Sequence, residues 1–404
     1  MNRYIWLLLL ALHCLFSTAK TTHLQDFAQT RPRLSPQAQI SLLTCSPSDD
    51  AVFTLYGHAA LRVNDPINKI DRIYNYGMFE FSQPNFIYRF AKGETDYNLG
   101  VSDISYFLFE YMSRGSEIYE QVLNLLQEEK EGLWRALEWN AQPENRVYRY
   151  NFFYDNCSTR PVDMIENNLQ GIIRYAPPTD PLPTFRNAIN YCTRYHPWQT
   201  FGCDLVLGLP TDRMMTQRET FFLPDNVKND FNKAEIVREG NATPLVKQIN
   251  ILAKEDQQQS ITPFYCTPLF CFSAFFILIM TLTGIEFSRK KQYRIIDVLL
   301  FFTAGIGGCI LFFLSFISVH PCTFPNISLL WLNPLHLTGI ILFSVKKFNT
   351  VAFWYHLINF AVVIVMLMGW IFIPQHFNLA FIPLIASLLL RSGGALIREK
   401  NLKG

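Results

Sequence analysis

The chain has 404 residues, enough for two or three domains, and half of them are hydrophobic. Its formal net charge is only +2 and its polar half has no long basic stripe, which weighs against nucleic-acid binding. The first 260 residues or so are of mixed polarity, whereas apolar runs dominate from Phe264 onward. The sequence therefore predicts a polar domain followed by a membrane domain.

The N-terminal segment has the features of a secretory signal peptide. Arg3 precedes an apolar core from Ile5 to Phe16, and Ser17-Thr18-Ala19 is a small-x-small cleavage pattern. We predict a signal peptide at residues 1–19, which places the following domain, residues 20–230, outside the cytoplasm. An uncleaved N-terminal anchor is the alternative.

Strand-like and helical patterns are mixed in the polar domain, which predicts an α+β fold. Four segments have the pattern of strands or extended chain: residues 38–43, 58–63, 70–81 and 146–154. Residues 117–140 have the spacing of an amphipathic helix, and another helix is predicted directly after Cys157. The polar residues 231–263 are interpreted as a linker to the bilayer.

Five apolar stretches follow the polar domain. They are residues 264–284, 295–319, 327–345, 351–373 and 377–397. A helix needs about 20 apolar residues to cross the hydrocarbon core, and the first four stretches are long enough. The fifth is interrupted by Arg391. We predict an all-α transmembrane bundle of about five helices at residues 264–397 and a cytoplasmic tail at residues 398–404.

Lysines and arginines are concentrated in the first and third connections between these stretches and in the tail, and the other two connections contain none. By the positive-inside rule, the basic connections are cytoplasmic. Five spans place every basic cluster in the cytoplasm and the polar domain outside, whereas four spans would export the basic tail. The sequence thus predicts a multi-pass protein of the cytoplasmic (inner) membrane whose polar domain faces the periplasm.

His336 and His356 lie within predicted spans, where an ionisable side chain invites a functional interpretation. We identified no acid in the spans that could form a proton pathway with them. Because both histidines are near span ends or close to Trp331 and Trp354, we interpret them as interfacial anchors.

The exported domain keeps four cysteines after removal of the signal peptide: Cys45, Cys157, Cys192 and Cys203. An oxidising compartment favours pairing, and Cys192 with Cys203 would close a short loop. This pair is the candidate disulfide, which leaves the other two as candidate free thiols.

Cys157 and His58 form the candidate catalytic pair. Cys157 lies at a strand-to-helix transition, where free N–H groups and positive potential can lower a thiol pKa and hold an oxyanion. Unlike His23 and His196, His58 opens a strand-like run, and Gly57 before it allows a tight turn. The alternative is a buried structural cysteine and a merely hydrogen-bonded histidine. Since the sequence has neither HExxH nor CxxC, we expect no metal and no cofactor.

Several motifs around this pair share an order with a known family. They are Leu42–Asp49, Tyr56–Val63, Tyr74–Phe79, Pro84–Phe86, Phe153–Arg160, Leu209–Arg213 and Phe222–Asp225. Together they resemble the Lnb-type N-terminal periplasmic domain of bacterial lipoprotein N-acyltransferases, over roughly residues 34–225, and the membrane half is also similar to that family. The resemblance implies a permuted papain-like thiol-enzyme fold, in which the histidine precedes the cysteine. The glycines usual after the first cysteine of the family are replaced by Ser46 and Ser48, and Pro161 follows the catalytic motif.

The resemblance also implies roles for individual residues. Cys157 becomes the nucleophile and His58 the base that holds it as a thiolate. Asn75, on the strand after His58, is assigned to orient the imidazole. Asn156 is assigned to help backbone N–H groups stabilise an oxyanion.

The activity implied by the resemblance is that of a lipoprotein N-acyltransferase. It would move a phospholipid acyl chain through a Cys157 thioester to the α-amine of a diacylglyceryl-cysteine lipoprotein. The expected partners are the phospholipid donor, the lipoprotein acceptor and the membrane, with no nucleic acid. A membrane-bound thiol hydrolase (a phospholipase or a cell-wall amidase or peptidase) is the nearest alternative, because nothing in the Cys/His pair selects an amine over water. A non-enzymatic envelope scaffold is the second alternative.

Overall fold

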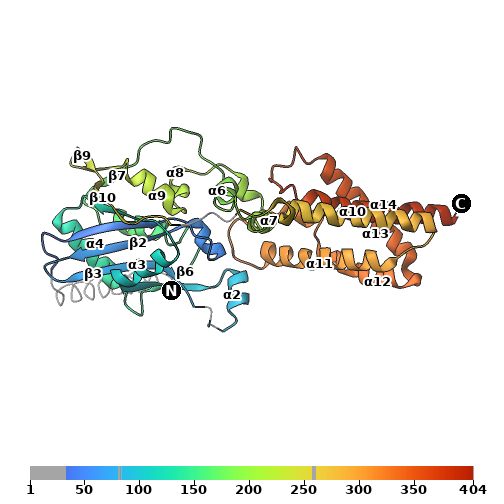
Figure 1. Ribbon diagram of the computed structural model, residues 1–404, viewed down its shortest axis with the longest axis horizontal. Coiled ribbons are helices and arrows are strands. Elements are labelled where there is room, and N and C mark those ends of the chain that lie inside the picture. The colour runs from blue at the N-terminus through green and yellow to red at the C-terminus, as the bar shows by residue number, and fades with distance from the viewer. Residues whose placement is uncertain (1–32, 81, 83, 257–260, 404) are drawn as a thin grey trace, which may run out of the picture. The chain divides into compact units, whose positions relative to one another are not determined.

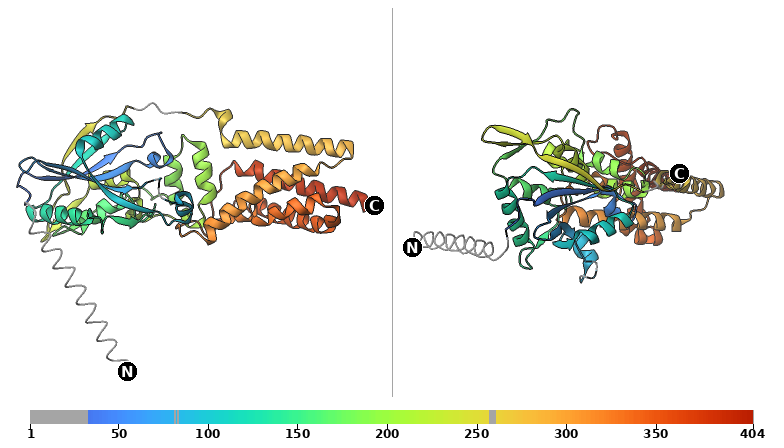
Figure 2. Two further views of the ribbon diagram at one scale, coloured as in Figure 1. Left: turned by 90° about the horizontal axis from the view of Figure 1, so that it is seen from below. Right: turned by 60° about the vertical axis from the view of Figure 1, so that its left-hand side comes forward.

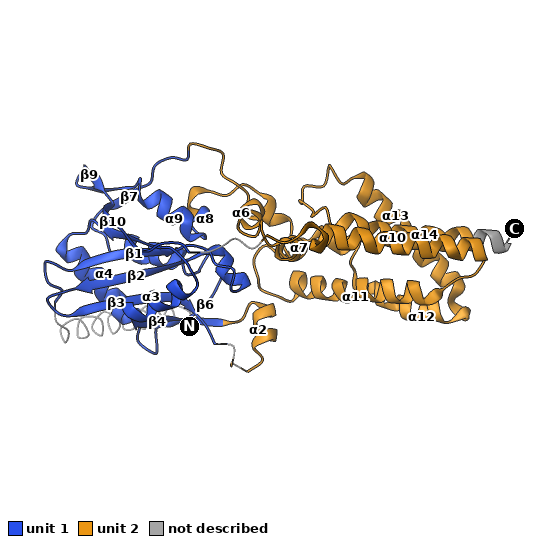
Figure 3. Cartoon of the chain, in the orientation of Figure 1, with its two compact units in different colours: residues 1–81, 96–178, 219–257 blue, residues 82–95, 179–218, 258–404 orange. Residues whose placement is uncertain are grey.

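In this computed structural model, residues 33–80, 82, 84–256 and 261–403 are described, and the chain forms two compact units (Figures 1 and 3). Unit 1 comprises residues 1–81, 96–178 and 219–257, and unit 2 comprises residues 82–95, 179–218 and 258–404. The predicted signal peptide and His23 lie outside the described residues.

Unit 1 is built on a seven-stranded sheet in which every pairing is antiparallel. The strand order is β10-β5-β1-β2-β3-β4-β6. These strands are β1 (Gln39–Cys45), β2 (His58–Asp65), β3 (Ile70–Met78), β4 (Asp96–Asp103), β5 (Ile118–Leu123), β6 (Val147–Arg149) and β10 (Val246–Ala253). A second sheet, of order β7-β8-β9, consists of β7 (Ile172–Arg174), β8 (Glu235–Arg238) and β9 (Asn241–Pro244).

Helices cover both faces of the larger sheet. They are the short η1 (Val52–Tyr56) and α3 (Ile104–Ser113), α4 (Gln127–Asn140), α5 (Thr159–Glu166), α8 (Gln217–Thr220) and α9 (Pro224–Phe231), of which α8 spans the boundary with unit 2. Successive side chains of a strand point to opposite faces. Leu42 accordingly packs in the core that contains residues of α4, α5 and α9, and Leu43 packs in the core that contains Phe107 and Tyr111 of α3. The central strands are therefore apolar on both faces.

Two predictions for this unit are wrong. Residues 117–140 are not one helix, because Ile118 and Val122 belong to β5, which pairs with β1 and β10. Two residues four positions apart lie on the same face of a strand and also on the same face of a helix, so their spacing fits both elements. The strand forms because these residues pair with distant strands. The predicted linker at residues 231–263 instead contains β8, β9 and β10. Its polar composition reflects the exposed side chains of an edge strand.

Unit 2 contains, among its described residues, five helical segments long and apolar enough to cross a membrane (Figure 2). They are Pro268–Arg289, Arg294–Phe316, Ile327–Ser344, Lys346–Met368 and Phe381–Arg398. The corresponding elements are α10 (Pro268–Arg289), α11 (Arg294–Phe316), η4 (Ile327–Leu330), η5 (Pro334–Thr338), α12 (Gly339–Ser344), η6 (Lys346–Phe348), α13 (Asn349–Met368) and α14 (Phe381–Lys403). The predicted α+β domain followed by a helical bundle is confirmed.

The third segment is irregular, because η4 and η5 precede the single α-helical stretch α12. It packs against α11, where a Cβ on Gly308 would lie only 2.3 Å from the carbonyl carbon of Asn333. Irregular backbone at membrane depth is tolerated where protein covers it. The His336 side chain stabilises this irregular segment with hydrogen bonds. Its Nε2 lies 2.9 Å from the carbonyl oxygen of Trp331, and its Nδ1 bonds the Tyr355 hydroxyl.

Our interpretation of the membrane histidines as interfacial anchors is wrong, since His336 and His356 are only 1% and 4% exposed. The spans also hold buried acids, contrary to the expectation from the sequence. Arg391 of α14 bonds Glu286 of α10 (Nη1 to Oε2, 2.6 Å) and Asp297 of α11 (Nε to Oδ1, 2.6 Å). These ion pairs join three membrane helices, which explains how an arginine can interrupt the fifth apolar stretch.

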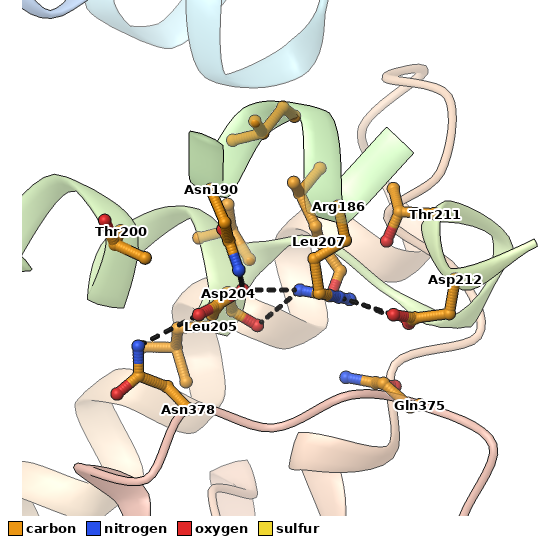
Figure 4. A network of polar contacts seen from close by, with 12 residues as sticks. Arg186, Asn190, Thr200, Asp204, Leu205, Leu207, Thr211, Asp212, Gln375 and Asn378 are labelled. Carbon is orange, nitrogen blue, oxygen red and sulfur yellow. Dashed lines mark hydrogen bonds and ion pairs between the residues drawn. The ribbon is translucent and has the colours of Figure 1, made fainter. Parts of the chain in front are cut away.

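Four further elements of unit 2 come from the region predicted to belong to the catalytic domain. They are α2 (Phe86–Lys92), α6 (Phe185–Cys192), α7 (Pro197–Val206) and η2 (Leu209–Asp212). The short η3 (Phe264–Cys266) directly precedes the first membrane segment. Buried Arg186 of α6 bonds Asp212 (Nε to Oδ1, 2.8 Å) and Asp204 (Nη1 to Oδ1, 3.2 Å), as Figure 4 shows. Asp204 also accepts a hydrogen bond from Asn378, which precedes α14, so this network fastens residues 179–218 to the membrane part of unit 2. The disulfide between Cys192 of α6 and Cys203 of α7 stays a prediction.

Candidate active site

The predicted catalytic residues converge at one end of the large sheet of unit 1. His58 is the first residue of β2 and Asn75 lies on the neighbouring strand β3. Cys157 precedes α5, and its sulfur accepts a hydrogen bond from the backbone N–H of Ala59, the residue after His58. Residues separated by about a hundred positions in the chain are thereby brought together.

Two glycines make this convergence possible. Gly57 has a φ of +74°, and a Cβ there would lie 2.8 Å from the carbonyl oxygen of Cys45. Gly77 has a φ of +91°, and a Cβ there would lie 3.3 Å from Cβ of Cys157. The register of β3 against β4 also shifts between Asn75 and Met78. Irregular strand pairing of this kind re-aims side chains next to active sites.

Asn75 and a tyrosine set the orientation of the His58 ring. Oδ1 of Asn75 lies 2.5 Å from Nε2 of His58, and the buried ring of Tyr111 stacks on the imidazole with centroids 5.6 Å apart. An amide oxygen only accepts, so Nε2 carries the hydrogen. The lone pair of the neutral imidazole is therefore on Nδ1, available to receive a proton.

The electrostatic environment favours uncharged forms of both groups. Burial lowers the pKa of His58 to about 4, helped by the charge of Arg114 and opposed by the hydrogen bond to Asn75. Burial raises the pKa of Cys157 to about 11, opposed by the N–H groups of Ala59 and of Cys157 itself. These shifts favour a thiol and a neutral imidazole at rest, and the expected thiolate held by His58 stays a prediction. From such a neutral pair, the proton has to leave the sulfur as the sulfur attacks.

A protonated Cys157 thiol beside a neutral His58 predicts how Cys157 reacts with an alkylating reagent. Only the thiolate reacts, and its fraction rises about tenfold per pH unit below the pKa. We expect the rate of Cys157 alkylation by iodoacetamide to climb steadily from pH 6 to pH 10, measured by mass spectrometry of the peptide that contains it. The exposed Cys266 provides an internal reference for reagent decay. A rate that is already constant at neutral pH would contradict the prediction, because it would reveal a thiolate–imidazolium pair.

Asn156 has a different role from the predicted one. Its Oδ1 accepts hydrogen bonds from the N–H groups of Ser158 (2.8 Å) and Thr159 (2.9 Å), which fixes the turn that leads into α5. Its Nδ2 donates to the carbonyl oxygens of Phe152 and Phe222, both at 2.8 Å. With both amide hydrogens occupied and the side chain buried, Asn156 cannot donate to an oxyanion. It is a positioning residue that fixes the backbone on either side of Cys157.

A cavity of about 250 Å³ opens beside His58 and Asn75. Its rim carries exposed apolar side chains, with Phe53 and Met78 51% and 41% exposed. The C-terminal half of α3 adds a charged pair, Glu110 and Arg114, whose side chains lie 2.7 Å apart. Sequence reasoning missed α3 entirely, because its residues match no catalytic pattern and their position follows only from the fold.

Cys45 is not a second nucleophile. It lies opposite His58 in the pairing of β1 with β2, but it is fully packed in the core, where burial raises the pKa of its thiol. A protonated, enclosed cysteine behaves as a small hydrophobic residue. Among the described residues, no group of three or more His, Cys, Asp or Glu side chains could hold a metal ion.

Comparison with known families accounts for both parts of the chain. The model of the Lnb N-terminal periplasmic domain matches residues 32–191, and the model of the Lnb transmembrane domain matches residues 256–402. The chain belongs to the Lnb family. Lnb membership indicates an enzyme of the lipoprotein N-acyltransferase type and a multi-pass membrane protein with a periplasmic N-terminal domain. No curated protein and no solved structure matches the chain.

The periplasmic Lnb match contains every residue of the candidate site. His58, Asn75 and Cys157 lie within residues 32–191, as do the two α3 side chains at the cavity. The match also ends inside α6, close to the point where the chain passes from unit 1 to unit 2.

Proposed function

We propose that this protein is a lipoprotein N-acyltransferase of the cytoplasmic membrane. It takes an acyl chain from a phospholipid, holds it as a thioester on Cys157, and delivers it to the α-amine of a diacylglyceryl-cysteine lipoprotein. The observation that carries the proposal is the hydrogen bond of Asn75 to His58, with Cys157 held by the N–H of the next residue, Ala59, in a chain with both Lnb domains. Asn75 fixes the imidazole tautomer, and the N–H of Ala59 holds the sulfur beside the same strand.

The first half-reaction forms the thioester. Nδ1 of His58 accepts the proton of the Cys157 thiol while the sulfur attacks the ester carbonyl carbon of the phospholipid. The N–H groups of Ala59 and Cys157, which donate to the sulfur, are the candidate donors for the developing oxyanion, and one such donor typically contributes about 2.7–4 kcal/mol. The carbon–oxygen bond then breaks, and His58 returns its proton to the departing glycerol oxygen. The products are acyl-Cys157 and a lysophospholipid.

The second half-reaction uses the same histidine. The uncharged α-amine of the lipoprotein attacks the thioester carbonyl, and Nδ1 of His58 takes a proton from the amine nitrogen. The carbon–sulfur bond breaks, the amide forms, and His58 passes the proton to the sulfur of Cys157. The neutral thiol and neutral imidazole are thereby restored, as in the resting site.

The surroundings of the cavity support a lipid donor. Its lining includes the exposed side chains of Phe53 and Met78 and the partly buried Phe79. Exposed apolar side chains of this kind mark sites for apolar ligands or surfaces. Five membrane segments are also more than a tether requires, and they would concentrate lipid substrates near the enzyme.

The proposal is tested with purified protein in nanodiscs, a phospholipid with a labelled acyl chain, and a synthetic diacylglyceryl lipopeptide. We expect label in the lipopeptide as an amide, together with a hydroxylamine-sensitive label on Cys157. Release of labelled free fatty acid without amide would show a phospholipase and overturn the proposal. Cleavage of muropeptides in place of lipid turnover would show a cell-wall hydrolase, and absence of any labelled enzyme would support a scaffold.

Asn75→Ala is expected to slow acyl transfer about ten- to a hundredfold, less than loss of the base itself, which typically contributes about 10²–10⁴-fold. The imidazole loses the acceptor that fixes its tautomer, but the nucleophile and base stay in place. The measurement is the rate of thioester formation in a single turnover. Asn75→Gln is a matched variant that keeps the amide but moves it by one methylene. An unchanged rate in both variants would contradict the orienting role.

A further inference from the structure

A second cavity lies within unit 2, far along the chain from the catalytic residues. It has a volume of about 180 Å³ and is lined by side chains of α11, α12, α13 and α14 and of the connection before α11. The polar and charged lining residues are Gln292, Arg294, Asn349, His356 and Arg398.

The topology places this cavity at the cytoplasmic end of the bundle. With the N-terminal domain in the periplasm, α10 runs inward and ends at Arg289, and α11 starts on the cytoplasmic side at Arg294. The fifth segment, which also runs inward, ends at Arg398. The cavity residues on these helices therefore lie at the depth of the inner-leaflet headgroups.

Arg398 leaves hydrogen-bonding capacity unused in the cavity wall. Its Nη1 bonds Oε2 of Glu286 at 2.8 Å, but its Nε and Nη2 are buried and have no hydrogen-bond partner among the described residues. A buried guanidinium N–H without an acceptor is costly, and such a group calls for an ion or ligand that is not part of the protein.

Arg294 adds a second cation, which has no carboxylate partner among the residues that the structure describes. There it donates to neutral oxygens, the Phe343 carbonyl at 3.3 Å and Oδ1 of Asn349 at 3.2 Å. The nearby ion-pair cluster contains Arg391 and Arg398 against Glu286 and Asp297, which balance each other. The charge of Arg294 is therefore not balanced within this cluster, and the described lining of the cavity is net positive.

We propose that this cavity binds the phosphate of an anionic phospholipid from the cytoplasmic leaflet. The planar fork of an arginine matches two phosphate oxygens, and Nε with Nη2 of Arg398 forms such a fork. Basic pockets between membrane helices on this side are typical headgroup sites. Apolar lining residues, Leu342, Phe343 and Phe353, provide a wall for the adjoining hydrocarbon chain, which favours a lipid over free phosphate. The bound lipid would join α11, α13 and α14.

The test measures lipid retention by native mass spectrometry of the full chain released from nanodiscs. We expect the wild-type protein to retain phosphatidylglycerol but not phosphatidylethanolamine, and Arg294→Gln and Arg398→Gln each to reduce the retained fraction about tenfold or more, the usual weight of a charge-assisted hydrogen bond. Lys347→Gln is the matched control, since Lys347 is exposed on the same side and does not line the cavity. It should retain lipid as the wild type does.

Three outcomes would overturn the inference. Equal retention by the wild type and the two arginine variants would show that the cavity holds no headgroup. Equal retention of both lipids would show that the phosphate charge is not recognised. A third contrary outcome is displacement of the lipid by millimolar inorganic phosphate, with phosphate raising the melting temperature as much as the lipid does. That result would show a site for the free anion. Because Arg398 also bonds Glu286, its variant can lose stability, and Arg294→Gln then decides on its own.

Discussion

Cys157→Ala is expected to abolish the formation of N-acylated lipoprotein, with a loss of at least about three orders of magnitude in rate. The variant removes the only protein atom that forms a covalent bond with the acyl chain of the donor in the proposed mechanism. Cys157→Ser should be almost as inactive, because a hydroxyl is far harder to deprotonate than a thiol and His58, with a pKa of about 4, is a weak base. The measurement is mass spectrometry of lipoprotein N-termini from cells in which this protein is the sole N-acyltransferase.

The control for this experiment is Cys45→Ala. Cys45 is a buried core cysteine in the neighbouring strand, so the variant removes a thiol from the same region without touching the cavity. Lipoproteins from these cells should remain N-acylated. Persistence of N-acylation in the Cys157→Ala cells would eliminate the thioester mechanism, whereas loss of N-acylation with both variants would trace the effect to folding.

Arg186→Met is expected to destabilise the protein by about 3–5 kcal/mol, the usual cost of removing one partner of a buried ion pair. The fully buried guanidinium binds Asp204 and Asp212, and it also donates to the carbonyl oxygens of Leu207 and Gly208. Without it, two carboxylates remain in a site closed to water. The measurement is the midpoint of thermal unfolding of the protein in detergent.

Two further variants distinguish the loss of the buried ion pairs from the effect of replacing any arginine in this segment. Arg194→Met, at an exposed arginine in the same segment that contacts Tyr191 and Tyr195, should leave the midpoint nearly unchanged. Combining Arg186→Met with Asp204→Asn and Asp212→Asn should recover part of the lost stability, because neutral amides replace the stranded charges. A midpoint for Arg186→Met equal to that of the wild type would mean that the network is not closed to solvent.

The residues of the candidate site were predictable where they lie in local motifs. Gly57 with His58, and Cys157 before a helix, are short patterns whose chemistry can be recognised from a few neighbours. Asn75 follows because adjacent strands in the sequence pair in the sheet. The tautomer of His58 and the neutral state of the pair could not be predicted, since both depend on burial and on contacts from α3.

Other parts of the structure depend on pairings between distant residues. The β5 pattern at Ile118 and Val122 fits a helix until β10, more than a hundred residues later, supplies a partner strand. Asn156 looks like a polar residue free for catalysis until Phe222 provides its carbonyl acceptor. Likewise, Arg391 looks like an interruption of a span until Glu286 and Asp297 lie beside it.

The protonated state of Cys157 has a consequence for survival of the enzyme outside the cytoplasm. Oxidants and disulfides react with thiolates and much more slowly with thiols. A nucleophile that kept its negative charge at rest would be steadily lost to sulfenic acid or mixed disulfides in the oxidising periplasm. Burial raises the pKa of Cys157, so in the proposed mechanism little thiolate exists until the sulfur attacks an ester. The same feature that slows each attack thus preserves the enzyme between turnovers.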